Sequence, residues 1–176
     1  MKHNSFSFFL IVLFSFQMLG QEKQFTRADT LRGSITPERA WWDVLRYDIQ
    51  VKPSFKNKYT SGFNKITYNP NLMQIDLQKP LVIDSIIYDK KQTLRFIREG
   101  NVYQVKTPSQ SMGSEHEVKI YFSGKPHEAI RPPWDGGWTF TKDEKGRPWM
   151  TVTCQGLGAS IWYPNKDHQS DEPDRG

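Results

Sequence analysis

Cysteine is almost missing from this sequence: Cys154 is the only one in 176 residues. A single cysteine excludes an intrachain disulfide, so the packing of an apolar core must hold the fold together. Cys154 falls on the apolar side of an alternating run, and we expect it to be a small buried residue. A buried thiol is inert, and no base stands near this one in the sequence. Cysteine-based catalysis therefore has no support.

The sequence also lacks a zinc motif of the thermolysin type. That motif, His-Glu-x-x-His on a helix, brings two imidazoles to one ion and supplies a glutamate as general base. His-Glu pairs begin at His116 and His127, but Ile120 and Arg131 stand where the second histidine is required. The first pair lies in an alternating strand, and two prolines follow the second. Neither pair is a zinc site, and we expect this chain to bind no metal or other cofactor.

Other catalytic motifs are missing as well. There is no Gly-x-Ser-x-Gly elbow for a serine nucleophile, and Gly156-Leu157-Gly158 does not lead into a helix that would cradle a phosphate. His168 beside Asp167 and Asp171 could hold a cation. A solvated acidic turn accounts for that cluster more simply, and the spacing of a calcium loop is absent. The chain shows no complete active site, so we expect it to be inactive alone.

No block of five or more basic residues occurs, although the net charge is +5. The positive charge is spread along the chain and indicates solubility and general surface character rather than a nucleic-acid site. No apolar run reaches the roughly 20 residues that a membrane-spanning helix needs. We therefore expect neither nucleic-acid binding nor a membrane span in the mature protein.

Residues 1–20 have the pattern of a signal peptide. Lys2 supplies a positive charge, an apolar run of about 14 residues follows, and Leu19-Gly20 offers a small residue at a cleavage point. An uncleaved N-terminal anchor is the alternative. No cysteine follows the run to carry a lipid. We expect an exported protein, located in the periplasm, at the cell surface or outside the cell.

Strand patterns fill most of the chain after a polar segment. Residues 21–40 are predicted to form an extended arm or linker, and residues 41–176 one β-domain, with no helical period of useful length. Glu99-Gly100-Asn101 is predicted to close a hairpin, and Asn69-Pro70-Asn71 is another turn. The fold class is all-β, either an antiparallel β-sandwich or a curved, open sheet. Strands are predicted at 44–51, 59–68, 72–77, 81–88, 94–97, 102–105, 118–122 and 149–154.

A loop rich in proline and glycine interrupts these strands at 126–137. Pro132 and Pro133 preclude a central strand there, and Trp134 and Trp138 flank a tight turn. Exposed aromatic rings at this place could stack on a sugar or a peptide. Alternatively, they cap the end of the sheet or pack on a neighbouring domain.

The most informative stretch runs from Trp149 to Asp174. An alternating strand ends near Cys154, and the polar residue Gln155 follows where a run of small, flexible residues begins. A polar side chain in a loop at the end of a strand is a common position for a ligand contact, because a rigid scaffold carries it. Three large residues and an acidic turn complete the stretch.

The run CQGLGASIWYPNKDHQSDEPD in this stretch resembles the end of the N-terminal domain of the aminopeptidase N family, peptidase family M1. PPWDGGWTF at 132–140 and RPWMTV at 147–152 fit the same pattern, and the similarity covers most of the chain after about Trp41. The resemblance implies a saddle-shaped β-domain packed on a following catalytic domain that holds zinc. The family's zinc and Gly-x-Met-Glu-Asn motifs do not occur in the 176 residues, so the resemblance implies an N-terminal fragment.

The resemblance also implies a substrate-binding role for one residue of this sequence, Gln155. Counting back from Pro164, Gln155 falls where the family places a Gln or Glu that holds the substrate's free α-amino group and lines the pocket for its first side chain. Gly156 stands beside it in the same loop. The alternative for Gln155 is a strand-end residue that bonds to loop backbone. Either Asp167 or Asp171-Glu172-Pro173 can match the family's Asp-Glu-Pro turn.

Two functions follow from these patterns. In the first, the chain is the non-catalytic N-terminal domain of an exported zinc aminopeptidase, which releases N-terminal residues from peptides, and it supplies one wall of the substrate pocket. In the second, it is a stand-alone secreted β-sandwich that binds carbohydrate or peptide through exposed tryptophans. The tryptophans that motivate the second function are Trp134, Trp138, Trp149 and Trp162.

Overall fold

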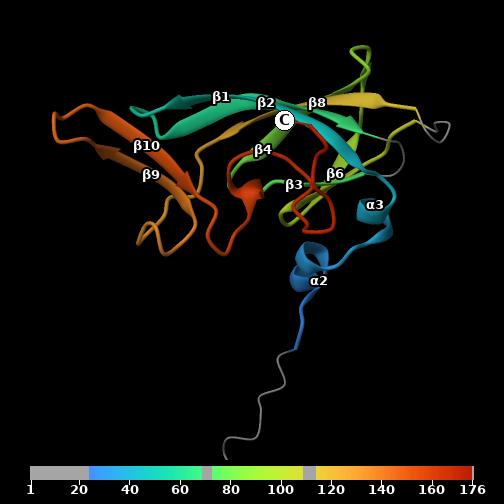
Figure 1. Cartoon of the computed structure of the whole chain (residues 1–176), viewed down its shortest axis with the longest axis horizontal. Helices are drawn as coiled ribbons and strands as arrows, with labels where there is room; N and C mark the ends of the chain where they lie inside the picture. Colours follow the sequence, from blue (N-terminus) through green and yellow to red (C-terminus); the bar gives the residue numbers. More distant parts are fainter. Residues whose placement is uncertain (1–23, 69–72, 109–113, 176) are drawn as a thin grey trace, which may run out of the picture.

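The computed structural model describes residues 24–68, 73–108 and 114–175. The predicted signal peptide at 1–20 and the predicted turn at 69–71 lie outside the described residues. Nearly half of the described chain forms antiparallel strands, which make up three sheets (Figure 1). The sheets are open at their edges, so the predicted all-β class with an open antiparallel sheet is confirmed.

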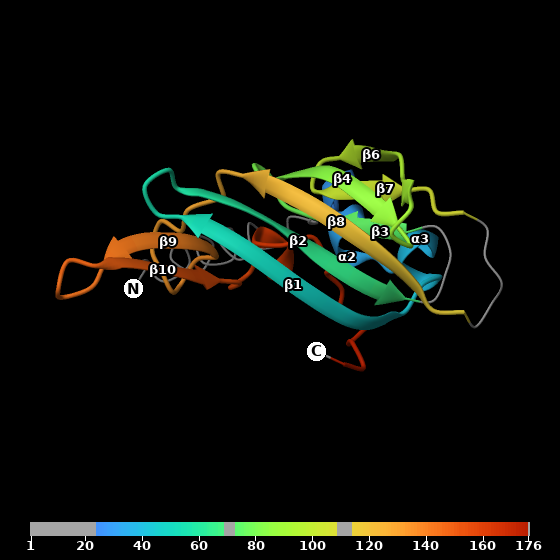
Figure 2. The ribbon, with the colours of Figure 1, turned by 90° about the horizontal axis from the view of Figure 1, so that it is seen from above.

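The largest sheet has five strands in the order β1-β2-β8-β4-β5 (Figure 2). Alternate side chains of its central strands enter the core: Ile66 and Val118 are fully buried, while Lys65 and Lys119 beside them are partly exposed. This period of two is the pattern from which the strands were predicted. In chain order the members are β1 (Val44–Ser54), β2 (Tyr59–Tyr68), β4 (Val82–Tyr88), β5 (Gln92–Thr93) and β8 (His116–Gly124).

A second sheet has three strands, in the order β3-β7-β6. They are β3 (Met73–Asp76), β6 (Phe96–Glu99) and β7 (Val102–Val105). The predicted hairpin is confirmed, because β6 and β7 pair from Glu99–Val102 onward across a two-residue loop. Gly100 in that loop has φ +63°, which glycine adopts at little cost. One apolar core joins both sheets, with Ile75 and Tyr103 from this sheet and Ile120 and Phe122 from the larger one.

The third sheet is the hairpin of β9 (Gly137–Lys142) and β10 (Pro148–Thr153), which projects at one end of the molecule (Figure 1). Within β9 the rings of Trp138 and Phe140 stack with their centroids 5.7 Å apart, and the contact of Phe140 with Phe55 joins the hairpin to the β1–β2 turn. Every predicted strand overlaps an observed one, but the two-residue strand β5 and the strand β9 were not predicted. The glycines before Trp138 suggested a turn, whereas Gly137 is the first residue of the strand.

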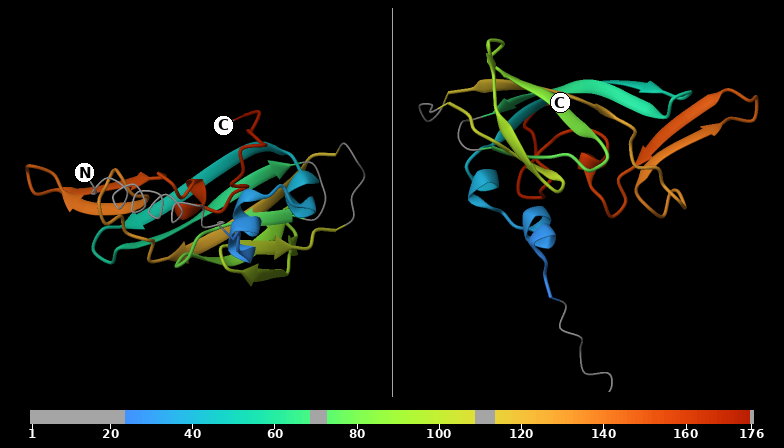
Figure 3. Two further views of the ribbon diagram at one scale, coloured as in Figure 1. Left: turned by 90° about the horizontal axis from the view of Figure 1, so that it is seen from below. Right: turned by 180° about the vertical axis from the view of Figure 1, so that it is seen from behind.

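The predicted extended arm at 21–40 is wrong for its described part. This segment forms two short helices, α2 (Arg27–Gly33) and α3 (Pro37–Ala40). A capping box, in which Thr26 and Asp29 bond each other's backbone N–H, starts α2, and Pro37 starts α3. Seen from below and from behind in Figure 3, both helices lie on the same side of the large sheet as the C-terminal loop. None of the described helices is long and apolar enough to cross a membrane.

Candidate functional site

The candidate site is the loop that follows β10, at residues 154–168. Its first turn is closed by the Cys154 carbonyl, which accepts hydrogen bonds from Leu157 N at 3.0 Å and Gly158 N at 2.9 Å. Gly156 and Gly158 have φ values of +67° and +78°, in the region that favours glycine. A short 3₁₀ turn, η1 (Ala159–Ile161), follows. The small residues that the sequence placed here are therefore required by the backbone.

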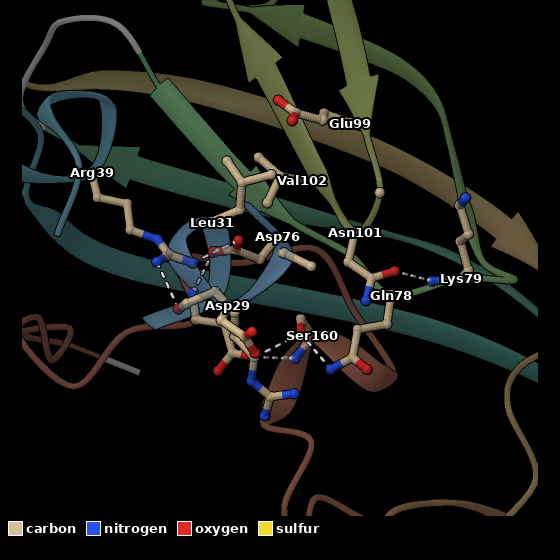
Figure 4. Close-up of a pocket in the computed structure, with 14 residues that line it drawn as sticks. Asp29, Leu31, Arg39, Asp76, Gln78, Lys79, Glu99, Asn101, Val102 and Ser160 are labelled. Atoms are coloured by element: carbon tan, nitrogen blue, oxygen red, sulfur yellow. Dashed lines mark hydrogen bonds and ion pairs between the residues drawn. The ribbon is translucent and has the colours of Figure 1, made fainter. Parts of the chain in front are cut away.

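Asp167 holds the middle of the loop from inside. Its Oδ2 accepts a hydrogen bond from Ser160 Oγ at 2.6 Å and lies against Gly158, where a side chain would collide with it. The Gln78 amide donates to Ser160 Oγ at 2.9 Å (Figure 4) and also to the Leu157 carbonyl. These contacts fix the loop path in one conformation from Leu157 to Ser160.

The far end of the loop is tied to β2 and β3. Asn165 and Asp76 exchange two backbone hydrogen bonds of 2.8 and 3.1 Å, and the buried Asn64 amide donates to the Pro164 carbonyl at 2.8 Å. The Asp76 carboxylate accepts from Asp167 N at 3.0 Å. The loop is therefore anchored to the sheets at its end as well as at its start.

Gln155 and Gly156 stand at the outer side of this anchored loop. Gln155 is exposed, and within the described part of the chain its side-chain amide has no hydrogen-bond partner. This observation disagrees with the alternative in which Gln155 bonds to loop backbone. The Gly156 carbonyl accepts a hydrogen bond of 2.6 Å from Arg32 of α2. Gly156 also borders an open hollow of about 1070 Å³ whose wall includes Tyr163 and His168.

A second, more enclosed cavity of about 410 Å³ lies between α2, the β6–β7 hairpin and the inner side of the loop (Figure 4). Its wall includes the ion pair of Arg39 and Asp76, 2.8 Å apart, whose side chains are 1% and 7% exposed. Burial raises the pKa of Asp76, although Arg39 and three hydrogen bonds favour the ionised carboxylate. Ser160 and Asp167 line the same cavity, so it lies directly behind the candidate loop.

No protein-family model matches this sequence, and no curated protein matches it. Solved structures do match its fold. A mutant M1 zinc metallopeptidase from Deinococcus radiodurans, bound to a Tyr-Ser-Ala substrate, matches 80% of this chain with a TM-score of 0.54 and 19% identity. Native leukotriene A4 hydrolase from Saccharomyces cerevisiae matches 76% with a TM-score of 0.61 and 14% identity. The yeast enzyme in complex with bestatin matches 89%, with a TM-score of 0.60 and 12% identity.

The chain has the fold of a β-domain of M1 zinc metallopeptidases. It spans only 22–33% of the length of these solved chains. At these identities the match establishes the fold alone. The M1 β-domain fold is the one that the sequence resemblance implied, and the candidate loop lies in the part of the chain where that resemblance is most specific.

Cys154, at the start of the loop in this M1 fold, is exposed, so the prediction of a buried thiol is wrong. The strand ends at Thr153, and the alternation that would have buried Cys154 ends with it. Partial burial, followed by the negative charge of Asp167, raises the pKa of the thiol. A raised pKa leaves little thiolate at neutral pH, which agrees with a cysteine that is not a nucleophile.

The tryptophan surface required by the carbohydrate-binding alternative is not assembled. Trp134 and Trp149 are 83% and 57% exposed, but Trp138 is only 4% exposed and stacks on Phe140. Trp162 is half-buried and packs on Tyr163, with ring centroids 4.4 Å apart. The expectation that all four present a ligand surface is therefore wrong for Trp138, which instead packs the third sheet.

The two acidic groups that could match the family's Asp-Glu-Pro turn have different roles. Asp167 is inside the loop, as described above. Asp171 is buried, pairs with Lys166 and accepts a hydrogen bond from Val44 N at 3.1 Å, which ties the turn to the start of β1. His168 bonds to Ser170 and to the Gly33 carbonyl. Across the described residues no group of three or more potential ligands could hold a metal ion.

Sequence reasoning missed the groups that hold the loop in place: Arg32, Arg39, Asp76 and Gln78. The capping box at Thr26–Asp29 was a readable signal for α2, and it would have corrected the extended arm. Nothing in the local pattern pairs Arg39 with Asp76, because the two residues are 37 positions apart and meet only when α3 packs on β3.

Proposed function

We propose that this chain is the N-terminal β-domain of an exported, zinc-dependent aminopeptidase of the M1 type. In this proposal the domain packs on a catalytic domain, and its loop at 154–168 forms one wall of the pocket for the peptide N-terminus. The observation that carries the proposal is the exposed Gln155 amide, which has no partner within the described chain and stands on a loop anchored at both ends. That loop follows a strand of an M1 β-domain fold.

Gln155 would bind the free α-ammonium group of the substrate through its amide oxygen. An ammonium loses water on entering a pocket, and each of its donors then needs an acceptor. A hydrogen bond to a charged group is worth about 1.5–3 kcal/mol. Because the loop is fixed before the substrate arrives, little ordering entropy is lost on binding. An acceptor for the ammonium selects peptides with an unblocked N-terminus.

Gly156 would leave room beside the substrate's first side chain. A Cβ at this position would have no neighbour within 4 Å, so the wall is open there. The described residues contain no cluster able to hold zinc, so the proposal assigns the zinc ion to another part of the polypeptide. There, zinc would polarise the scissile carbonyl and supply the bound water.

The test is to isolate, from the source cells, the polypeptide that carries this domain, using an antibody raised against residues 24–175. We expect peptide mass spectrometry to find a Gly-x-Met-Glu-Asn motif and a His-Glu-x-x-His motif in the same polypeptide. It should release p-nitroaniline from aminoacyl-p-nitroanilides, lose this activity to a chelator and regain it with zinc. The proposal is wrong if the isolated polypeptide has neither motif and no chelator-sensitive activity. Its mature N-terminus should lie near residue 21, because residues 1–20 would be removed on export.

A further inference from the structure

The N-terminal strap, defined as residues 24–40, contacts the candidate loop at two places. Arg32 Nη2 donates a hydrogen bond of 2.6 Å to the Gly156 carbonyl, across 124 positions of sequence. The Gly33 carbonyl is 3.3 Å from His168 Nε2. Ser170 N donates to Nδ1 of the same ring, so the imidazole proton lies on Nε2 and is donated to Gly33. The strap therefore reaches both the start and the end of the loop.

The strap is itself held by a buried ion pair. Arg39 Nη1 donates to the carbonyls of Arg32 and Ser34 at 2.8 and 2.9 Å, and Nη2 pairs with Asp76 at 2.8 Å. Asp76 also accepts from the backbone N–H of Asp167, inside the loop. The Arg39 guanidinium, which faces Asp76 in Figure 4, thus fixes Arg32, the residue that holds Gly156. The Asp76 carboxylate fixes the far end of the loop.

The hydrogen bond from Arg32 is made to the Gly156 carbonyl, in the residue that directly follows Gln155. Gly156 has a positive φ, and open space surrounds the position that a Cβ would occupy. Its carbonyl belongs to the peptide bond between Gly156 and Leu157. The backbone hydrogen bonds that close the turn around it are accepted by the Cys154 carbonyl. Through the hydrogen bond from Arg32, the strap directly contacts the start of the loop, at Gly156.

We propose that the N-terminal strap positions Gln155, with Arg32 as a positioning residue that acts through the Gly156 carbonyl. The effect on substrate binding rests on the proposed function. The claim that Arg32 holds the loop at Gly156 does not depend on it. Arg32 touches no reacting atom in this arrangement. It limits the orientations of the Gln155 amide, so that the acceptor for the substrate ammonium is in place before binding.

Hydrogen exchange on the chain tests the structural part. Arg32→Ala should speed exchange of the Leu157 and Gly158 amides by about three- to tenfold, since it removes one of the hydrogen bonds that hold their turn. Arg32→Lys, which keeps a donor, should lie between the parent and Arg32→Ala. The matched control is Arg27→Ala: Arg27 is on the same helix but pairs with Glu99, 3.0 Å away, and does not contact the loop. Equal exchange at Leu157 and Gly158 in all four proteins would overturn the proposal.

Steady-state kinetics of the aminopeptidase that carries this domain tests the consequence. Arg32→Ala should raise KM for an unblocked aminoacyl-p-nitroanilide while kcat changes little, and Arg32→Lys should restore part of the loss. In a Gln155→Ala background, Arg32→Ala should have no further effect, because the two residues act on one contact. An equal rise of KM in both backgrounds would contradict positioning through Gln155. If Gln155→Ala itself leaves KM unchanged, the proposed function fails, and the exchange experiment still decides whether the strap holds the loop.

Discussion

Gly158 is the position in the candidate loop at which an added side chain would be most destabilising. Its φ is +78°, and an added Cβ would lie 2.6 Å from Asp167 Oδ1 and closer still to Oδ2. Gly158→Ala carries about 1–3 kcal/mol for a backbone conformation that L side chains rarely adopt and about 1–3 kcal/mol for the collision. It should therefore lower the free energy of unfolding by about 2–6 kcal/mol and break the hydrogen bond between Ser160 and Asp167. Gly156→Ala is the matched control, because Gly156 has a similar φ but open space around it.

Urea unfolding of both variants measures this difference. Gly156→Ala carries only the cost of a left-handed backbone, about 1–2 kcal/mol. Gly158→Ala should be the less stable of the two, and equal stabilities would show that Asp167 does not constrain the loop.

Asp43 is the residue for which a gain in stability is expected. Burial, followed by a hydrogen bond and charge repulsion from Asp171, raises the pKa of Asp43 above its ordinary value of 3.8. A raised pKa in the folded state means that ionised Asp43 disfavours folding at neutral pH, and that this cost disappears as the pH falls below 3.8. Asp43→Asn should stabilise the protein at pH 7 by less than about 1 kcal/mol, because Asp43 is exposed and its interactions are screened. Thermal unfolding of the parent and of Asp43→Asn at pH 7 and below pH 3.8 measures the gain in stability. An equal gain at the two pH values would show that the ionised Asp43 carboxylate is not its cause.

Single residues also show what sequence reasoning can reach. Gln155 was singled out as a polar residue at the end of a strand, and its substrate role came from the family resemblance. The structure places Gln155 exposed in the loop after β10, and its substrate role stays a prediction. Cys154, one residue earlier, was misassigned because the alternation stops one residue before it. Arg39 and Asp76 could not be found from the sequence, because a buried pair depends on two elements meeting in space.

The helix α3 and the strand β3 depend on each other through that pair. Removing Arg39 would leave the Asp76 carboxylate buried without a cation, which costs about 3–5 kcal/mol. Arg39→Met should therefore destabilise strongly at pH 7. Burial already raises the pKa of Asp76, and loss of Arg39 would raise it further, so part of the lost stability should return as the pH falls and the carboxylate is protonated.

The control for this element is the double variant Arg39→Met with Asp76→Asn, measured by urea unfolding. It removes both charges together, so it should be more stable than Arg39→Met alone. If Arg39→Met costs less than about 1 kcal/mol, the pair does not join α3 to β3 in the way described here.

Among the helices and strands, the long strands with alternating side chains were predictable from the sequence. The short helices α2 and α3, and the strand β9 that follows a proline-glycine loop, were not. β2 and β7 were predicted at their observed bounds, because turn residues flank a clear period of two. β9 was missed because Gly137 and the prolines before it read as a break. The strap was missed because its two helices are too short to show a helical period, although the cap at Thr26 marks the first.

For the whole molecule, the all-β class was predicted from the number and spacing of strands, and the M1 β-domain fold from the resemblance of the last third of the chain. The arrangement of the sheets was not predictable, because β8 pairs with both β2 and β4 through contacts that no local pattern specifies. The hydrogen bond between Arg32 and the Gly156 carbonyl could not be predicted from the sequence, since the two residues lie near opposite ends of the chain.

The central claim is that the loop of this domain binds the substrate's free amino group through Gln155. The most direct measurement is the steady-state kinetics of Gln155→Ala and Gln155→Glu in the aminopeptidase proposed to carry the domain. Gln155→Ala should raise KM for an unblocked substrate by roughly 10- to 100-fold, the loss of one hydrogen bond to a charged group, with a smaller change in kcat. Gln155→Glu keeps an acceptor and should retain a KM near that of the parent enzyme. If both variants keep kcat/KM within about twofold of the parent, Gln155 does not contact the substrate and the account is wrong.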